Sequence, residues 1–135
     1  MKRYIYKQLL AWKNEKEHKP LILNGARQVG KTYILREFGR NEYKRMAFFS
    51  LDRDQKALEI FNKGGRATDM LMALSAICHE DITPHDTLVV LDEIQNCPKA
   101  LEALKFFCEE TPEIDIVVAG SLLGLSIHSG VSYPV

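Results

Sequence analysis

Several features that would direct an interpretation are missing from this 135-residue sequence. No apolar run approaches the roughly 20 residues that a membrane-spanning helix needs. The basic and acidic residues balance at 18 each, so the formal net charge is zero and gives no indication of a nucleic acid or an anionic membrane as partner. The first 19 residues contain no continuous apolar stretch and no small-residue cleavage site. We therefore predict no signal peptide and a cytoplasmic protein.

Cysteine is also scarce. The three cysteines are widely separated, none forms a C-x-x-C pair, and no histidine lies at zinc-ligand spacing from any of them. We expect reduced thiols that pack as small hydrophobic side chains, and no metal site built from cysteine and histidine. The cysteines are Cys78, Cys97 and Cys108.

What the sequence does contain is a phosphate-binding motif, because residues 25–32 fit the pattern G-x-x-x-x-G-K-[ST]. The two glycines let several backbone N–H groups point at one anion. Lys31 brings a positive charge to the β and γ phosphates, and Thr32 offers a hydroxyl to Mg²⁺. A buried strand predicted at 20–24 and a helix predicted from the loop to about Arg40 provide the context that this motif requires. We predict that ATP and Mg²⁺ bind to Gly25, Ala26, Arg27, Gln28, Val29, Gly30, Lys31 and Thr32.

Arg27 lies inside this loop and has two interpretations. Its side chain either reaches a phosphate or a neighbouring subunit, or it is simply a solvated loop arginine. The sequence leaves both open.

A second motif lies further along the chain, where an apolar strand predicted at 87–91 ends in Asp92 and Glu93. The carboxyl ends of parallel strands are where ligands bind in open sheets. Asp92 is suited to hold Mg²⁺, and Glu93 to take a proton from a water that attacks the γ-phosphate. Alone, the pair is equally a strand cap or a turn. Together with the phosphate loop it predicts ATP hydrolysis.

Ser121 is the third candidate, because it follows a strand predicted at 114–119. In the ATPase branch that carries Asp-Glu, an extra strand lies between the loop strand and the Asp-Glu strand, and its tip carries a polar sensor of the γ-phosphate. We therefore expect the 114–119 strand between the strands at 20–24 and 87–91, with Ser121 as the sensor. A serine in an ordinary turn is the alternative.

Strand and helix signals alternate along the chain, and the strands are nearly continuous apolar runs. This pattern predicts an α/β fold of three layers, with a parallel sheet covered by helices on both faces. In the helix near the end we expect Leu101, Leu104 and Cys108 to be buried. The other predicted elements are a first helix within 1–19, a strand at 46–51 covered on both faces, and helices at 52–62, 68–80 and 98–110.

Three segments carry a family resemblance. Residues 19–32, 91–101 and 119–124 resemble the prokaryotic AAA-type P-loop ATPases that bear a C-terminal domain of unknown function. The helical spacing of Ile5, Leu9 and Trp12 predicts an N-terminal helix within 1–19, and the resemblance implies a P-loop core of the additional-strand branch at 20–135. It implies Glu93, Lys31 and Ser121 as catalytic residues, and Thr32 and Asp92 as metal ligands. In full-length relatives it also implies a C-terminal domain that contacts DNA or a protein.

The last part of the sequence departs from this family. Residues 120–135 contain no Lys, Arg, Asp or Glu, and no arginine follows Arg66. We therefore expect residues 1–135 to be a partial AAA-type domain, truncated before the last core strand and without an arginine finger.

Two functions follow from this pattern. The first is Mg-dependent ATP hydrolysis coupled to conformational change, impaired in this short chain. The alternative is a nucleotide-binding regulatory module or fragment without significant turnover. A small-molecule kinase is disfavoured by the Asp-Glu pair. We predict ATP as ligand and no membrane partner, and leave a protein partner or self-association open.

Overall fold

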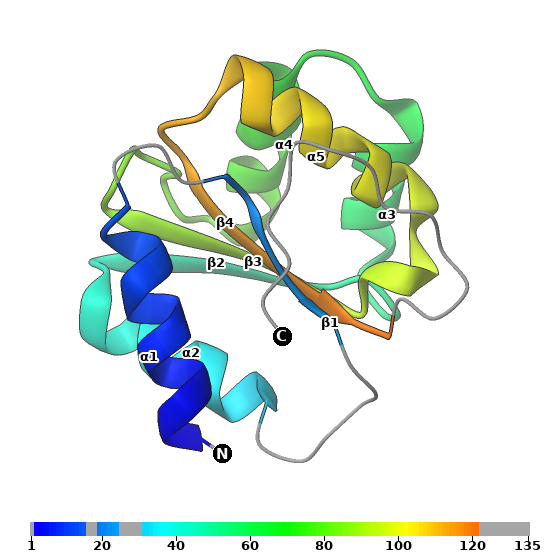
Figure 1. Ribbon diagram of the computed structural model, residues 1–135. Coiled ribbons are helices and arrows are strands. Elements are labelled where there is room, and N and C mark those ends of the chain that lie inside the picture. Colours follow the sequence, from blue (N-terminus) through cyan, green and yellow to red (C-terminus); the bar gives the residue numbers. More distant parts are fainter. Residues whose placement is uncertain (1, 16–18, 25–30, 122–135) are drawn as a thin grey trace.

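The computed structural model describes residues 2–15, 19–24 and 31–121. A sheet forms the middle layer, and helices cover each of its faces (Figure 1). The elements, in chain order, are α1 (Lys2–Lys13), β1 (Leu21–Asn24), α2 (Lys31–Glu42), β2 (Arg45–Ser50), α3 (Gln55–Lys63), α4 (Ala67–Cys78), β3 (Thr87–Asp92), the 3₁₀ helix η1 (Ile94–Asn96), α5 (Pro98–Glu110) and β4 (Asp115–Gly120). None of the helices in these ranges is long and apolar enough to cross a membrane.

The four strands of this sheet are parallel and lie in the order β1-β4-β3-β2. Strand β4 therefore lies between β1 and β3, with Val117 paired to both Leu21 and Val90. The predicted strand order is confirmed. Because all strands run the same way, their carboxyl ends meet at one edge of the sheet. Asp92 and Gly120, the last residues of the two central strands, lie at that edge.

Two hydrophobic clusters hold the layers together. The alternation of side chains along β3 sends Val89 into one cluster and Val90 into the other. The first cluster packs the sheet against α3, α4 and α5. In it the rings of Phe61 and Phe107 pack edge to face, with their centroids 6.4 Å apart. The second packs it against α1 and α2, around Phe38. Figure 1 shows the two groups of helices on opposite sides of the sheet, as the sequence predicts.

The predicted buried stripe of α5 is partly wrong. Leu104 is buried as expected, but Leu101 and Cys108 are only half-buried. The helix buries Ala100, Ala103, Leu104 and Phe107 instead. The buried face of α5 therefore includes two alanines, and their small side chains let the helix lie close to its neighbours.

The first helix spans Lys2–Lys13, within the predicted range 1–19. One face of strand β2 is covered less completely than predicted, because Met46 and Phe48 are only half-buried. Ala47 is buried, whereas Phe48 is half-buried and has the Arg36 guanidinium 4.0 Å from its ring centroid.

A buried polar pair joins two elements that are far apart in sequence. The Tyr43 hydroxyl, between α2 and β2, donates a hydrogen bond of 2.6 Å to Asp115 Oδ2 at the start of β4. Burial, together with this carboxylate, raises the pKa of Tyr43 well above its usual range. The sequence pattern predicts neither partner, because their proximity exists only in the folded sheet.

The cysteines are free thiols, as the sequence predicts. Cys97 is buried, and its burial raises the pKa of the thiol. A thiol in such surroundings is a packing group and a poor nucleophile.

Candidate nucleotide site

Most of the predicted phosphate loop, residues 25–30, lies outside the described residues, and so does the side chain of Lys31. The elements on either side of the loop are described. Strand β1 ends at Asn24, and α2 begins at Lys31. The first turn of α2 contains no acidic residue, so no carboxylate there competes for the N–H groups and positive dipole end that favour anions.

Thr32 and Asp92 meet at the carboxyl edge of the sheet, although sixty residues separate them in sequence. Thr32 Oγ1 donates a hydrogen bond of 3.1 Å to Asp92 Oδ2. Thr32 is exposed and Asp92 is half-buried, so both oxygens lie near solvent. Neighbouring ligands of an octahedral Mg²⁺, with bonds of about 2.0–2.1 Å, are themselves about 2.9 Å apart. The spacing and the chemistry of this hydroxyl and carboxylate therefore fit Mg²⁺.

Glu93 begins a tight turn in an unusual backbone conformation. Its φ of 55° and ψ of 47° lie in the left-handed region, which a non-glycine residue seldom adopts. The Asp92 carboxylate supports the turn by accepting a hydrogen bond of 2.9 Å from the Glu93 N–H. The fully buried Ile94 anchors the following 3₁₀ helix, and Pro98 then starts α5. This strain, held by its surroundings, is typical of functional sites.

Gln95 links this turn to the end of β4. Its Nε2 donates a hydrogen bond of 2.8 Å to Glu93 Oε1, and its Oε1 accepts one of 3.1 Å from the Ser121 N–H. Gly120 leaves room for the link, because a Cβ at this position would meet Gln95 Oε1, and it would lie 2.9 Å from the Ile94 nitrogen. The sequence pattern does not single out Gln95, whose one distinguishing feature there is an amide side chain two residues after Glu93.

The predicted site residues therefore converge only in part within the described structure. Thr32, Asp92 and Glu93 are joined by hydrogen bonds, and the backbone of Ser121 reaches them through Gln95. Ser121 is half-buried at the tip of β4. Nothing in these contacts involves its hydroxyl, so its role as a sensor stays a prediction.

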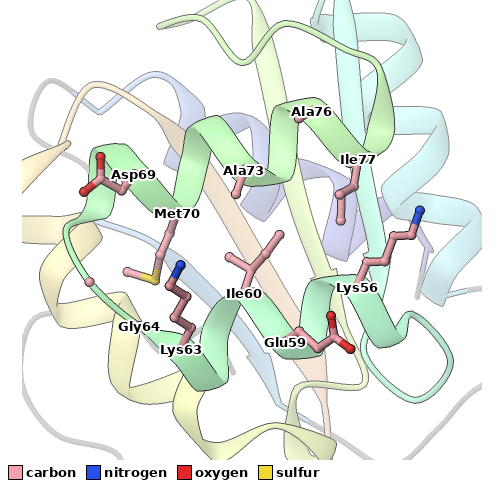
Figure 2. A pocket seen from close by; sticks show the side chains of 11 residues that line it. Lys56, Glu59, Ile60, Lys63, Gly64, Asp69, Met70, Ala73, Ala76 and Ile77 are labelled. Carbon is pink, nitrogen blue, oxygen red and sulfur yellow. The ribbon is translucent and has the colours of Figure 1, made fainter.

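A groove of about 840 Å³ lies elsewhere, between α3 and α4 (Figure 2). Ile60 from α3 and Met70 from α4 point into it, while charged side chains such as Lys63 and Asp69 surround it. None of the candidate site residues lines this groove. It is thus separate from the site at the carboxyl edge of the sheet.

A family model described as an AAA domain matches residues 17–134. The chain belongs to the AAA domain family. This membership supports nucleotide binding and hydrolysis in general, and the family generally uses ATP and Mg²⁺. No curated protein matches the AAA domain described here.

Among solved structures, the AAA domain is similar to unliganded Pif1 from Bacteroides sp, with 17% sequence identity and a TM-score of 0.43. The match covers 93% of this chain and 33% of the Pif1 chain. The AAA domain therefore spans about a third of the length of that protein.

Proposed function

We propose that this AAA domain binds ATP with Mg²⁺ and hydrolyses it to ADP and phosphate. The observation that carries the proposal is the 3.1 Å hydrogen bond between Thr32 Oγ1 and Asp92 Oδ2. It brings the hydroxyl of the phosphate motif to the carboxylate that ends the Asp-Glu strand. Both are hard oxygen ligands of the kind that Mg²⁺ prefers.

Each residue has a proposed part in binding. The backbone N–H groups of the loop at 25–30 and the Lys31 ammonium hold the phosphates, and Thr32 and Asp92 hold Mg²⁺. When bound, Mg²⁺ neutralises charge that develops on the phosphate oxygens. Gly25 and Gly30 allow the loop backbone to close around the anion.

Glu93 is the proposed general base. The oxygen of a water molecule forms a bond to the γ-phosphorus as its proton passes to the Glu93 carboxylate. The bond between the γ-phosphorus and the bridging oxygen breaks, and ADP leaves with that electron pair. Ser121 is proposed to respond to the γ-phosphate from the tip of β4. We propose that the loss of this phosphate drives a conformational change in the protein or a partner in the cytoplasm.

Two substitutions test binding and chemistry separately. Lys31→Ala removes a charged hydrogen-bond donor, so Mg·ATP affinity in a nucleotide titration should fall by roughly 10- to 100-fold. Glu93→Gln should leave that affinity unchanged and lower the rate of phosphate release by roughly 10²- to 10⁴-fold. Glu59→Gln, which changes an exposed carboxylate on α3, is the matched control. Equal affinity of the wild type and Lys31→Ala would sink the proposed binding site.

A second candidate function is a nucleotide-binding module with little turnover. The observation that favours it is that no arginine follows Arg66 in this sequence. An arginine finger contributes about 10³- to 10⁵-fold to the rate of phosphoryl transfer, and residues 67–135 contain no arginine that could act as one. The same assay distinguishes the two functions, because a module of this kind binds Mg·ATP without releasing phosphate.

A further inference from the structure

The side-chain amide of Gln95 makes a hydrogen bond at each of its two ends. The nitrogen end donates to Glu93 Oε1 at 2.8 Å, and the oxygen end accepts from the Ser121 N–H at 3.1 Å. A side-chain amide offers a donor on its nitrogen and an acceptor on its oxygen, so it can bond to two different groups at once. Gln95 therefore connects the turn after β3 to the tip of β4 through one rigid planar group.

The surrounding backbone is shaped around this connection. Glu93 takes a left-handed conformation, which directs the chain into η1 and so towards β4. Gly120 has a φ of 153°, and a side chain there would collide with Gln95. Ile94 and Cys97 are both buried, so the backbone is anchored on each side of Gln95. A conformation of this kind persists only where several contacts support it.

We propose that Gln95 is a positioning residue that orients the Glu93 carboxylate and couples it to the tip of β4. The inference deepens the proposed function, on which it rests, because Glu93 is the proposed base and Ser121 the proposed sensor. Movement of the Ser121 backbone pulls on the Gln95 oxygen, and the amide carries this movement to Glu93 Oε1. The Glu93 carboxylate is then oriented for catalysis only while the Ser121 N–H at the tip of β4 donates its hydrogen bond to Gln95.

Three variants separate this role from a general effect on the fold. Gln95→Met removes both hydrogen bonds at similar side-chain length. Gln95→Glu keeps an oxygen for the Ser121 N–H but sets a like charge beside Glu93. Asn96→Ala is the matched control, because Asn96 lies exposed in the same turn and its side-chain amide donates a long hydrogen bond of 3.4 Å to the Glu93 backbone oxygen, not to the Glu93 carboxylate.

The first measurement compares turnover with binding. We expect Gln95→Met and Gln95→Glu to lower kcat by roughly 10- to 100-fold, because a misplaced base loses its alignment. Their Mg·ATP affinity should equal that of the wild type, and Asn96→Ala should match the wild type in both values. A wild-type kcat in Gln95→Met would overturn the proposal.

The second measurement needs no hydrolysis. In ¹H–¹⁵N NMR spectra without nucleotide, Glu93→Gln should shift the side-chain NH₂ signals of Gln95 and the backbone amide signal of Ser121. In the Gln95→Met background, Glu93→Gln should leave the Ser121 signal in place. An equal shift of Ser121 in both backgrounds would show that Gln95 does not couple the two residues.

The two measurements also separate this inference from the proposed function. A wild-type chain that does not bind Mg·ATP contradicts the proposed function, and the NMR comparison still decides whether Gln95 couples Glu93 to β4. Normal binding and turnover with no coupling in the spectra contradict the inference alone.

Discussion

Asp92 uses its two carboxylate oxygens for different contacts. Oδ1 accepts from the Glu93 N–H and so shapes the turn that follows β3, whereas Oδ2 accepts from Thr32 Oγ1. One side chain thus supports the backbone of the proposed base and also carries the oxygen that we propose as a metal ligand. An Asn at this position would still have an oxygen for one of these contacts but no charge for Mg²⁺.

Substitutions of Thr32 test the proposed metal site. Thr32→Val removes the hydroxyl at nearly constant volume, so it should weaken nucleotide binding in the presence of Mg²⁺ and make that binding less sensitive to EDTA, with Asp92 left as the proposed protein ligand. Thr32→Ser keeps the oxygen and should retain both the affinity and its dependence on Mg²⁺. The measurement is the ATP affinity of each variant, titrated with and without Mg²⁺. A Mg²⁺ dependence in Thr32→Val equal to that of the wild type would exclude the hydroxyl as a ligand.

The role of a single residue can be predicted from the sequence only where that residue belongs to a recognised motif. The sequence indicates Thr32, Asp92 and Glu93 because each motif has a fixed spacing along the chain. Gln95 and Gly120 are far apart in sequence and come close only when β4 pairs with β3 in the folded sheet. No periodicity or spacing in the sequence expresses that contact.

At the scale of elements, the pattern of apolar residues predicts nearly every helix and strand. The order of the strands came instead from the resemblance to the Asp-Glu branch, because periodicity shows that a strand exists but not which strands are neighbours. The buried stripe of α5 was mispredicted for a related reason. The hydrophobicity of leucine and cysteine predicts their burial ahead of alanine, whereas the helix buries the small residues Ala100 and Ala103.

The buried bond between Tyr43 and Asp115 joins the start of β4 to the chain between α2 and β2. Tyr43→Phe removes the donor and leaves a buried carboxylate with one hydrogen bond fewer, so the free energy of unfolding at pH 7 should fall by about 1–3 kcal/mol. Tyr4→Phe, at an exposed tyrosine, is the matched control and should change little. Urea denaturation measures both.

The raised pKa of Tyr43 also gives a pH dependence with a definite sign. In the unfolded chain this tyrosine ionises near its ordinary pKa of 10.0, while the folded chain keeps it protonated. Its contribution to stability is therefore complete below pH 10 and is lost as the pH rises above that value, by about 1.4 kcal/mol per pH unit. The difference between the wild type and Tyr43→Phe should shrink above pH 10. A constant difference up to pH 11 would contradict this account.

At the scale of the whole molecule, the sheet separates two hydrophobic clusters and carries the candidate site at its carboxyl edge. Thr32 lies on α2, which packs on one face, whereas Glu93 and Gln95 precede α5, which packs on the other. A ligand held by both groups would therefore contact elements from both layers. Because such a ligand binds only the folded chain, its binding should stabilise the domain as a whole.

Thermal unfolding measures this linkage directly. At an ATP concentration of about 100 times Kd, with Mg²⁺ in excess, the free energy of unfolding should rise by about 2.7 kcal/mol, and the Tm should rise with it. EDTA should remove most of the gain, because Thr32 and Asp92 would then hold no metal to join the two layers through the phosphates. Lys31→Ala should show a smaller gain of about 0.4–1.4 kcal/mol at the same ATP concentration, because its affinity is 10- to 100-fold lower. Glu93→Gln should retain the full gain, since the proposed base acts in the chemical step and not in binding. A stabilisation by ATP that stays at its full size both with EDTA and in Lys31→Ala would mean that the nucleotide binds somewhere other than the carboxyl edge of the sheet.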